Sequence, residues 1–112
     1  MLNKAKNHIL EFALYGKEPL HLLFLSLEMN KVCLNVREAI PLIMDLARDG
    51  YLEVYYHSGM AGDKYREVRH LGEDELQKFT DRIEPHGFKE YPEDGEYFVK
   101  TTDAGARLIT EE

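Results

Sequence analysis

The chain has 112 residues, of which 44% are hydrophobic, so it is long enough for one domain with a modest core and short for two. Its formal net charge is −7 and unevenly spread, because residues 1–37 sum to +2 and residues 38–112 to −9. The single cysteine, Cys33, excludes an internal disulfide and a zinc site of paired thiolates, and it favours a reducing, cytoplasmic setting.

The first third of the chain predicts two helices. Residues 4–15 carry apolar side chains at helical spacing, and Gly16 marks their end. Pro19 suits the first turn of a second helix over residues 20–29, where a missing N–H is tolerated. This second segment is apolar on most sides, so we expect it to be the buried centre of the domain. The longest apolar run covers only residues 22–25, so we expect no membrane span.

A third helix is predicted over residues 36–49. Asn35 is its expected N-cap, with Glu38 reaching back to the Asn35 backbone N–H, and Gly50 supplies the left-handed residue that ends it. Pro41, at the sixth helical position, is expected to remove a hydrogen bond and to bend the helix at a cost of roughly 3 kcal/mol. Six apolar residues share the face that we expect to be buried: Val36, Ala39, Ile40, Ile43, Leu46 and Ala47.

Beyond Gly50 the hydrophobic period changes from 3.6 to 2, which predicts a strand over residues 51–57. A glycine-containing loop then leads to a returning strand over residues 64–71. A further strand is expected over residues 96–102. The pattern leaves open whether residues 51–57 pair with 64–71, with 96–102 or with both.

Two more helices complete the expected elements. Residues 73–84 have acids in the first turn and apolar side chains at helical spacing. Pro92–Gly95 forms a turn that would join residues 88–91 to 96–102 as a second hairpin. Thr102 is the expected cap of a last helix that reaches about residue 109.

Two stretches carry a resemblance to a known family. NVREAIPLIMDLARDGYLEVYYHSG is similar to the third helix, strand and wing of winged helix-turn-helix domains, and EYFVKTTDAGARLI looks like the strand and helix that close many bacterial winged-helix regulators. The resemblance implies one α+β domain over residues 1–112: a three-helix bundle with a helix-turn-helix, a β-wing, an inserted helix after the wing and a short C-terminal helix. It also implies a DNA-binding transcriptional regulator that acts as a homodimer, with its third helix in the major groove.

The resemblance, together with the local clusters of basic residues, implies DNA contacts from nine residues. Arg37 would read guanine, a contact worth about 1–3 kcal/mol of discrimination. Instead of contacting DNA, Arg37 and Arg48 could simply lie on the solvent-exposed surface of the helix. The basic residues of the wing could likewise serve to protect an edge strand from pairing with other chains. The contacts from the helix and its N-terminus are Lys31, Asn35, Arg37, Glu38, Pro41 and Arg48, and those from the wing are Lys64, Arg66 and Arg69.

A competing class is a protein-interaction module that uses the same fold without binding DNA. The acidic net charge favours it, together with an apolar rim of Leu42, Met44 and Met60. An enzyme is not expected, because the five histidines lack metal-ligand spacing and Cys33 has no assignable basic partner. We therefore expect no metal and no cofactor. The first or the last helix is the expected dimer element.

Overall fold

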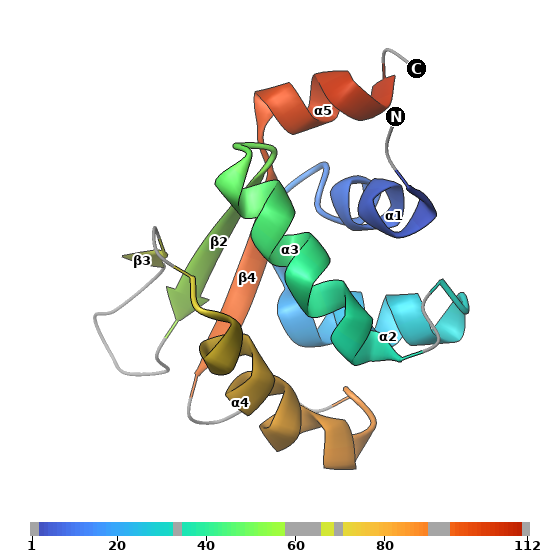
Figure 1. Ribbon diagram of the computed structural model, residues 1–112, viewed down its shortest axis with the longest axis vertical. Coiled ribbons are helices and arrows are strands. Elements are labelled where there is room, and N and C mark those ends of the chain that lie inside the picture. The colour runs from blue at the N-terminus through green and yellow to red at the C-terminus, as the bar shows by residue number, and fades with distance from the viewer. Residues whose placement is uncertain (1–2, 33–34, 58–65, 69–70, 90–94, 111–112) are drawn as a thin grey trace.

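The computed structural model describes residues 3–32, 35–57, 66–68, 71–89 and 95–110. This part of the chain forms a mixed α+β fold with five α-helices and a four-stranded antiparallel sheet (Figure 1). The elements are α1 Lys4–Phe12, β1 Glu18–Pro19, α2 Leu20–Met29, the 3₁₀ turn η1 Val36–Glu38, α3 Ala39–Arg48, β2 Leu52–His57, β3 Arg66–Glu67, α4 Glu73–Ile83, the 3₁₀ turn η2 Glu84–His86, β4 Glu96–Thr101 and α5 Asp103–Thr110.

The strand order is β1-β4-β2-β3. β2 and β4 pair along their whole length, from Leu52 opposite Thr101 to His57 opposite Glu96. The other edge of β2 pairs with β3, so β2 lies between two partners, which answers the pairing that the sequence left open. The two-residue β1 has no sequence signature of its own and pairs with β4 at the far edge.

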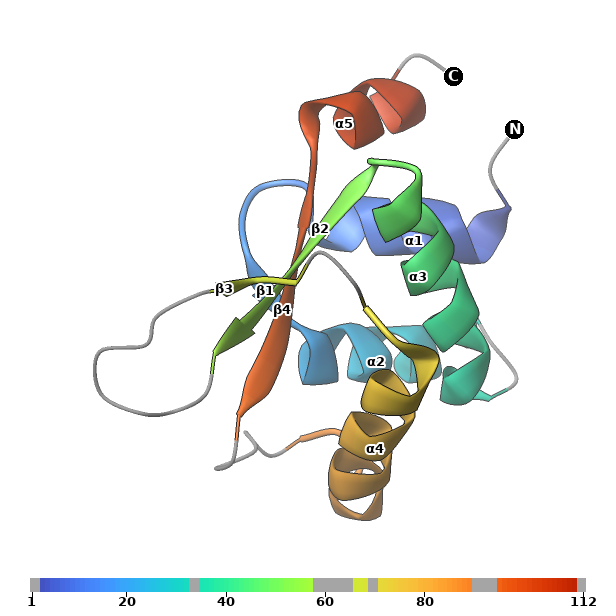
Figure 2. The ribbon, with the colours of Figure 1, turned by 60° about the vertical axis from the view of Figure 1, so that its left-hand side comes forward.

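The helices lie around this sheet. Figures 1 and 2 show α1, α2 and α3 together on one side of β2 and β4, with α5 beside α1 and α4 at the opposite end of the molecule. α2 contributes five buried residues, as expected for a central helix, although Leu22 is 38% and Met29 is 71% exposed. The fully buried core side chains include Ile9, Leu10, Leu20, Leu23, Phe24, Leu27, Ile40, Ile43, Leu46, Leu76 and Phe79.

The apolar stripe of the third helix is confirmed, and the predicted single helix is divided into a 3₁₀ turn and an α-helix just before Pro41. Asn35 caps a 3₁₀ turn, and the α-helix itself begins only at Ala39. Pro41 therefore lies in the first turn of α3, where backbone N–H groups have no partner within the helix in any case. It has no N–H to donate to the Arg37 carbonyl, and the residues before Ala39 form a 3₁₀ turn instead of α-helix. Gly50 ends the helix with a φ of 83°, as expected.

Other boundaries differ from the prediction in length. α1 ends at Phe12 instead of residue 15, and the described part of the strand expected over 64–71 is limited to Arg66 and Glu67. The strand expected over 88–91 is absent at its two described residues, since Phe88 follows the η2 turn with a φ of 59°. The cap of the last helix is confirmed: the Gly105 N–H donates to Thr102 Oγ1 at 3.1 Å.

Candidate nucleic-acid interface

The outer edge of α3 and the turn before it is the surface that the sequence pointed to. Glu38, Pro41 and Arg48 follow one another at helical spacing and are all exposed, with Asp45 half-buried between them. Arg48 Nη2 lies 2.5 Å from Asp45 Oδ1, and Lys6 Nζ lies 3.8 Å from Asp45 Oδ2. The structure therefore brings these residues together on one accessible edge. Arg48, the cation of this edge, is already paired with the Asp45 carboxylate.

Arg37 points away from this edge and binds α4. Its Nη1 donates to Gln77 Oε1 at 2.6 Å, and its Nη2 donates to Asp81 Oδ1 at 2.5 Å and to Glu84 Oε1 at 3.0 Å. The hydrogen bonds to Glu84 and Asp81 raise the pKa of Arg37 further above its ordinary value. A guanidinium held by two carboxylates needs to leave them before it can contact a base. We call this set of contacts the Arg37 clasp.

The N-terminus of the third helix is less available to a phosphate than the sequence suggested. Asn35 Oδ1 accepts the Arg37 N–H at 2.9 Å, and the Asn35 carbonyl accepts the Glu38 N–H at the same distance. These N–H groups are the donors that an anion would use. Lys31 is exposed in the turn after α2, with a φ of 54°, so it is the accessible cation closest in sequence to this terminus.

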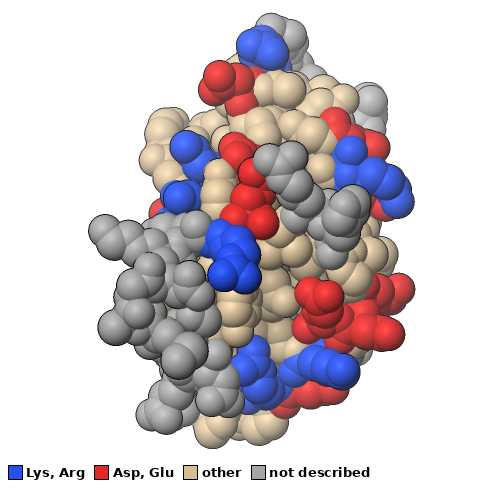
Figure 3. All heavy atoms as spheres, turned by 90° about the vertical axis from the view of Figure 1, so that its left-hand side faces the viewer, with Lys and Arg blue, Asp and Glu red and all other residues tan. Residues whose placement is uncertain are grey.

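The predicted wing contacts are only partly within the described residues. Arg66 is exposed on β3, opposite Tyr56 of β2. Lys64 and Arg69 lie outside the described residues, as does Cys33. Seen from the side of β3, Figure 3 shows lysine and arginine side chains interspersed with aspartate and glutamate, without a continuous basic patch. The described residues of this face thus offer separate cations to a polyanion instead of a positive stripe.

A groove of about 880 Å³ separates α3 from the β2–β3 side of the sheet. Its apolar lining includes Met44, Leu52 and Leu71. Arg48 is the cation on its wall, whereas three carboxylates contribute to the same lining: Glu53, Glu67 and Glu75. The groove is thus an apolar trough with an acidic border.

Sequence reasoning missed the partners of Arg37. Asp81 and Glu84 lie three residues apart and face the same way, a spacing visible in the sequence, but nothing local indicates that they meet a residue more than 40 positions earlier. Among the described residues, no group of three histidine, cysteine, aspartate or glutamate side chains is placed to hold a metal ion. Of the helices in the described part of the chain, none has both the length and the apolar composition needed to cross a bilayer.

Comparison with known proteins gives no relative for this chain: no family model, curated protein or solved structure matches it.

Proposed function

We propose that the chain is a winged-helix domain that binds double-stranded DNA and acts as a transcriptional regulator in the cytoplasm, as a homodimer. The observation that carries the proposal is the accessible edge of α3 formed by Glu38, Pro41 and Arg48, next to the hairpin of β2 and β3. In winged helices the third helix enters the major groove and the following hairpin touches the backbone.

The order of the elements supports the winged-helix assignment. Two helices precede α3, and the two long strands β2 and β4 follow it, with the short β1 completing the sheet beside β4. β3 and α4 then form an insertion between β2 and β4. A winged helix without additions would lack this insertion.

Charge limits how tightly one copy can bind. From Arg37 to Asp49 there are two arginines against three acids, and both arginines are paired with carboxylates. Non-specific DNA affinity comes mainly from cations that neutralise phosphates, so a single edge of this composition binds weakly. Two copies on one duplex would raise the effective affinity without any new contact, which is why we include a homodimer in the proposal.

The test is binding to a random-sequence duplex by fluorescence anisotropy, at about 50 mM and about 200 mM salt. We expect weak binding at low salt that falls by tenfold or more at high salt, with analytical ultracentrifugation showing a dimer. Arg48→Ala should reduce the affinity, whereas Lys100→Ala, at an exposed position of β4, should leave it unchanged. A chain that fails to bind DNA at low salt overturns the proposal.

A second candidate function rests on the acidic groove between α3 and the hairpin. Three glutamates around an apolar trough fit a peptide with apolar and basic side chains, as in a protein-interaction module. A library of peptides with alternating leucine and lysine, titrated against the chain, tests this candidate. Glu53→Gln with Glu67→Gln should weaken the binding of lysine-containing peptides. DNA binding without peptide binding rejects this candidate, and the reverse result rejects the first.

A further inference from the structure

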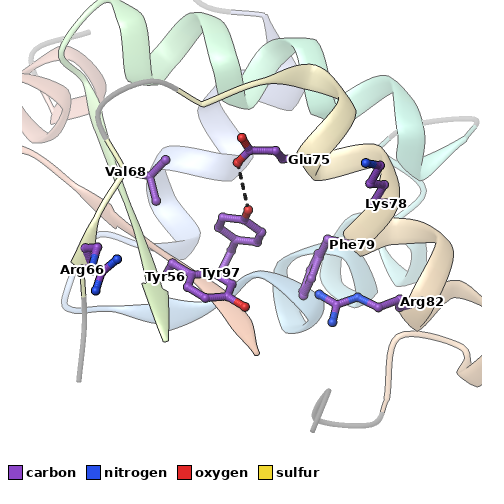
Figure 4. A pocket seen from close by; sticks show the side chains of 8 residues that line it. All are labelled: Tyr56, Arg66, Val68, Glu75, Lys78, Phe79, Arg82 and Tyr97. Carbon is purple, nitrogen blue, oxygen red and sulfur yellow. Dashed lines mark hydrogen bonds between the residues drawn. The ribbon is translucent and has the colours of Figure 1, made fainter. Parts of the chain in front are cut away.

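A second cavity, of about 590 Å³, lies between α4 and the outer end of the sheet. It is separate from the polar edge of α3. Tyr56 comes from β2, Tyr97 from β4 and Phe79 from α4, and Figure 4 shows these three rings gathered at its inner side. The size falls within the range of about 300–1,000 Å³ that is usual for small-molecule sites.

The three rings form one rigid cluster. The Tyr56 and Tyr97 centroids are 5.1 Å apart, and the Phe79 and Tyr97 centroids are 5.3 Å apart with ring planes at 89°. Phe79 and Tyr97 are buried, so packing holds their positions without a ligand. Edge-to-face rings present a surface on which a further flat apolar group can stack.

The described residues that line the cavity are mostly basic where they are charged. Three of them are cations, Arg66, Lys78 and Arg82, against one carboxylate, Glu75, although the chain as a whole carries −7. Lys78 and Arg82 are one helical turn apart on α4, and Figure 4 shows Arg82 reaching from the helix toward Phe79. The Arg82 guanidinium lies 5.4 Å from the centre of the Phe79 ring. The one carboxylate accepts a hydrogen bond from the Tyr97 hydroxyl at 3.3 Å.

An apolar base under a cationic border suits one chemical class of ligand. We infer that this cavity binds a small organic anion with a flat ring system and one carboxylate or sulfonate group. The ligand ring packs on Tyr56, which is the partly exposed ring of the cluster and is held in place by Tyr97, and the acidic group faces Lys78 and Arg82. The inference does not depend on whether α3 binds DNA, since the polar edge of α3 and this cavity have no residue in common; only Arg66 belongs both to the border of the cavity and to the predicted wing contacts.

Two fluorescent probes of the same shape test the inference: 8-anilinonaphthalene-1-sulfonate, which is an anion, and N-phenyl-1-naphthylamine, which is neutral. The wild-type chain should bind one sulfonate dye per molecule. Lys78→Gln with Arg82→Gln should lower the affinity for the sulfonate dye about tenfold, because this dye loses charge-assisted contacts. The affinity for the neutral dye should change by less than about twofold. Val68→Phe, which narrows the cavity, should weaken both dyes.

The matched control is Lys100→Gln with Arg107→Gln, which removes one lysine and one arginine from exposed positions away from the cavity. This pair should keep the wild-type affinity for both dyes. Circular dichroism confirms that each variant is folded before titration. Equal losses in the control pair and the cavity pair, or a Val68→Phe variant that binds both dyes normally, overturn the inference.

Discussion

At the scale of single residues, the most consequential contact is a buried pair that joins the start of α2 to the start of β4. His21 Nδ1 lies 2.5 Å from Glu96 Oε2, and the His21 backbone N–H donates to Glu96 Oε1 at 3.2 Å. The side chain of Glu96 is fully buried. Because Pro19 leaves α2 without a side-chain cap of its own, the carboxylate of Glu96 takes that role from a distant part of the chain.

This pair predicts a fall in stability at alkaline pH. Burial raises the pKa of Glu96 to about 8 and lowers the pKa of His21, so the folded pair holds one proton up to about pH 8. In the unfolded chain, with ordinary values of 4.5 and 6.5, the pair holds one proton between these values and none above. Stability therefore decreases between pH 6.5 and 8, by up to about 2 kcal/mol.

Urea denaturation at several pH values, for the wild type and Glu96→Gln, measures this effect. Glutamine keeps the acceptor for the His21 N–H but does not titrate, so the variant should lose the alkaline decrease. The unfolding free energy of the wild type minus that of the variant should therefore be higher at about pH 6 than at about pH 8.5. A difference that is the same at both pH values would show that Glu96 is not protonated in the fold.

Gly105 is a second residue with a specific role, because its lack of a side chain lets α5 pack closely against Tyr51 and Thr101. A Cβ at this position of α5 would lie 2.2 Å from the Tyr51 carbonyl oxygen and 2.8 Å from Thr101 Cγ2. Gly105→Ala should destabilise the chain by about 1–3 kcal/mol, the usual range for overpacking. Gly16→Ala is the control, because a Cβ at this position meets nothing within 4 Å. This substitution should change the free energy of unfolding by less than about 0.5 kcal/mol. Thermal unfolding compares them.

At the scale of elements, the Arg37 clasp joins the turn before α3 to α4. The carboxylates of Asp81 and Glu84 bind the Arg37 guanidinium in the way that DNA phosphates would. Asp81→Asn with Glu84→Gln releases Arg37 and removes two acids beside the proposed interface. Under the DNA-binding proposal, the double variant should bind duplex DNA about three to ten times more tightly than the wild type.

The control for charge alone is Glu73→Gln with Asp74→Asn, at the exposed start of α4. It changes the net charge by the same amount without touching Arg37. Its DNA affinity should lie close to that of the wild type. Equal gains in both pairs would mean that general repulsion, and not the clasp, limits binding.

The elements also show which features the sequence could predict. The stripe of α3, its Gly50 end and the Asn35 cap of the turn before it were predictable, because helix periodicity and end signals are local. The start of α3 at Ala39 was not, since the choice between a 3₁₀ and an α turn at residues 36–38 is not encoded in the hydrophobic pattern. The contacts from Arg37 to α4 and from His21 to Glu96 join residues 40 or more positions apart, and no local pattern predicts them.

At the scale of the whole molecule, one continuous core connects the elements. Buried residues of α1, α2, α3, α4, β2 and β4 belong to a single cluster. α4 is part of it: Phe79 packs on Tyr97 of β4, and Phe88, just beyond the η2 turn, packs on Phe24 of α2 with centroids 5.7 Å apart. The radius of gyration is 13.3 Å, close to the value of about 13 Å expected for a compact domain of this length.

This continuity predicts one cooperative unfolding transition. An insertion that packed only on the surface would melt separately, whereas α4 shares its buried side chains with α2 and the sheet. Calorimetric and van't Hoff enthalpies should therefore agree, with a heat-capacity change of about 1.5 kcal/mol/K. Phe79→Ala should destabilise the whole chain by about 3–5 kcal/mol and keep a single transition. Near- and far-ultraviolet circular dichroism should melt together in both proteins; a separate early transition in the wild type would show that α4 is an independent unit.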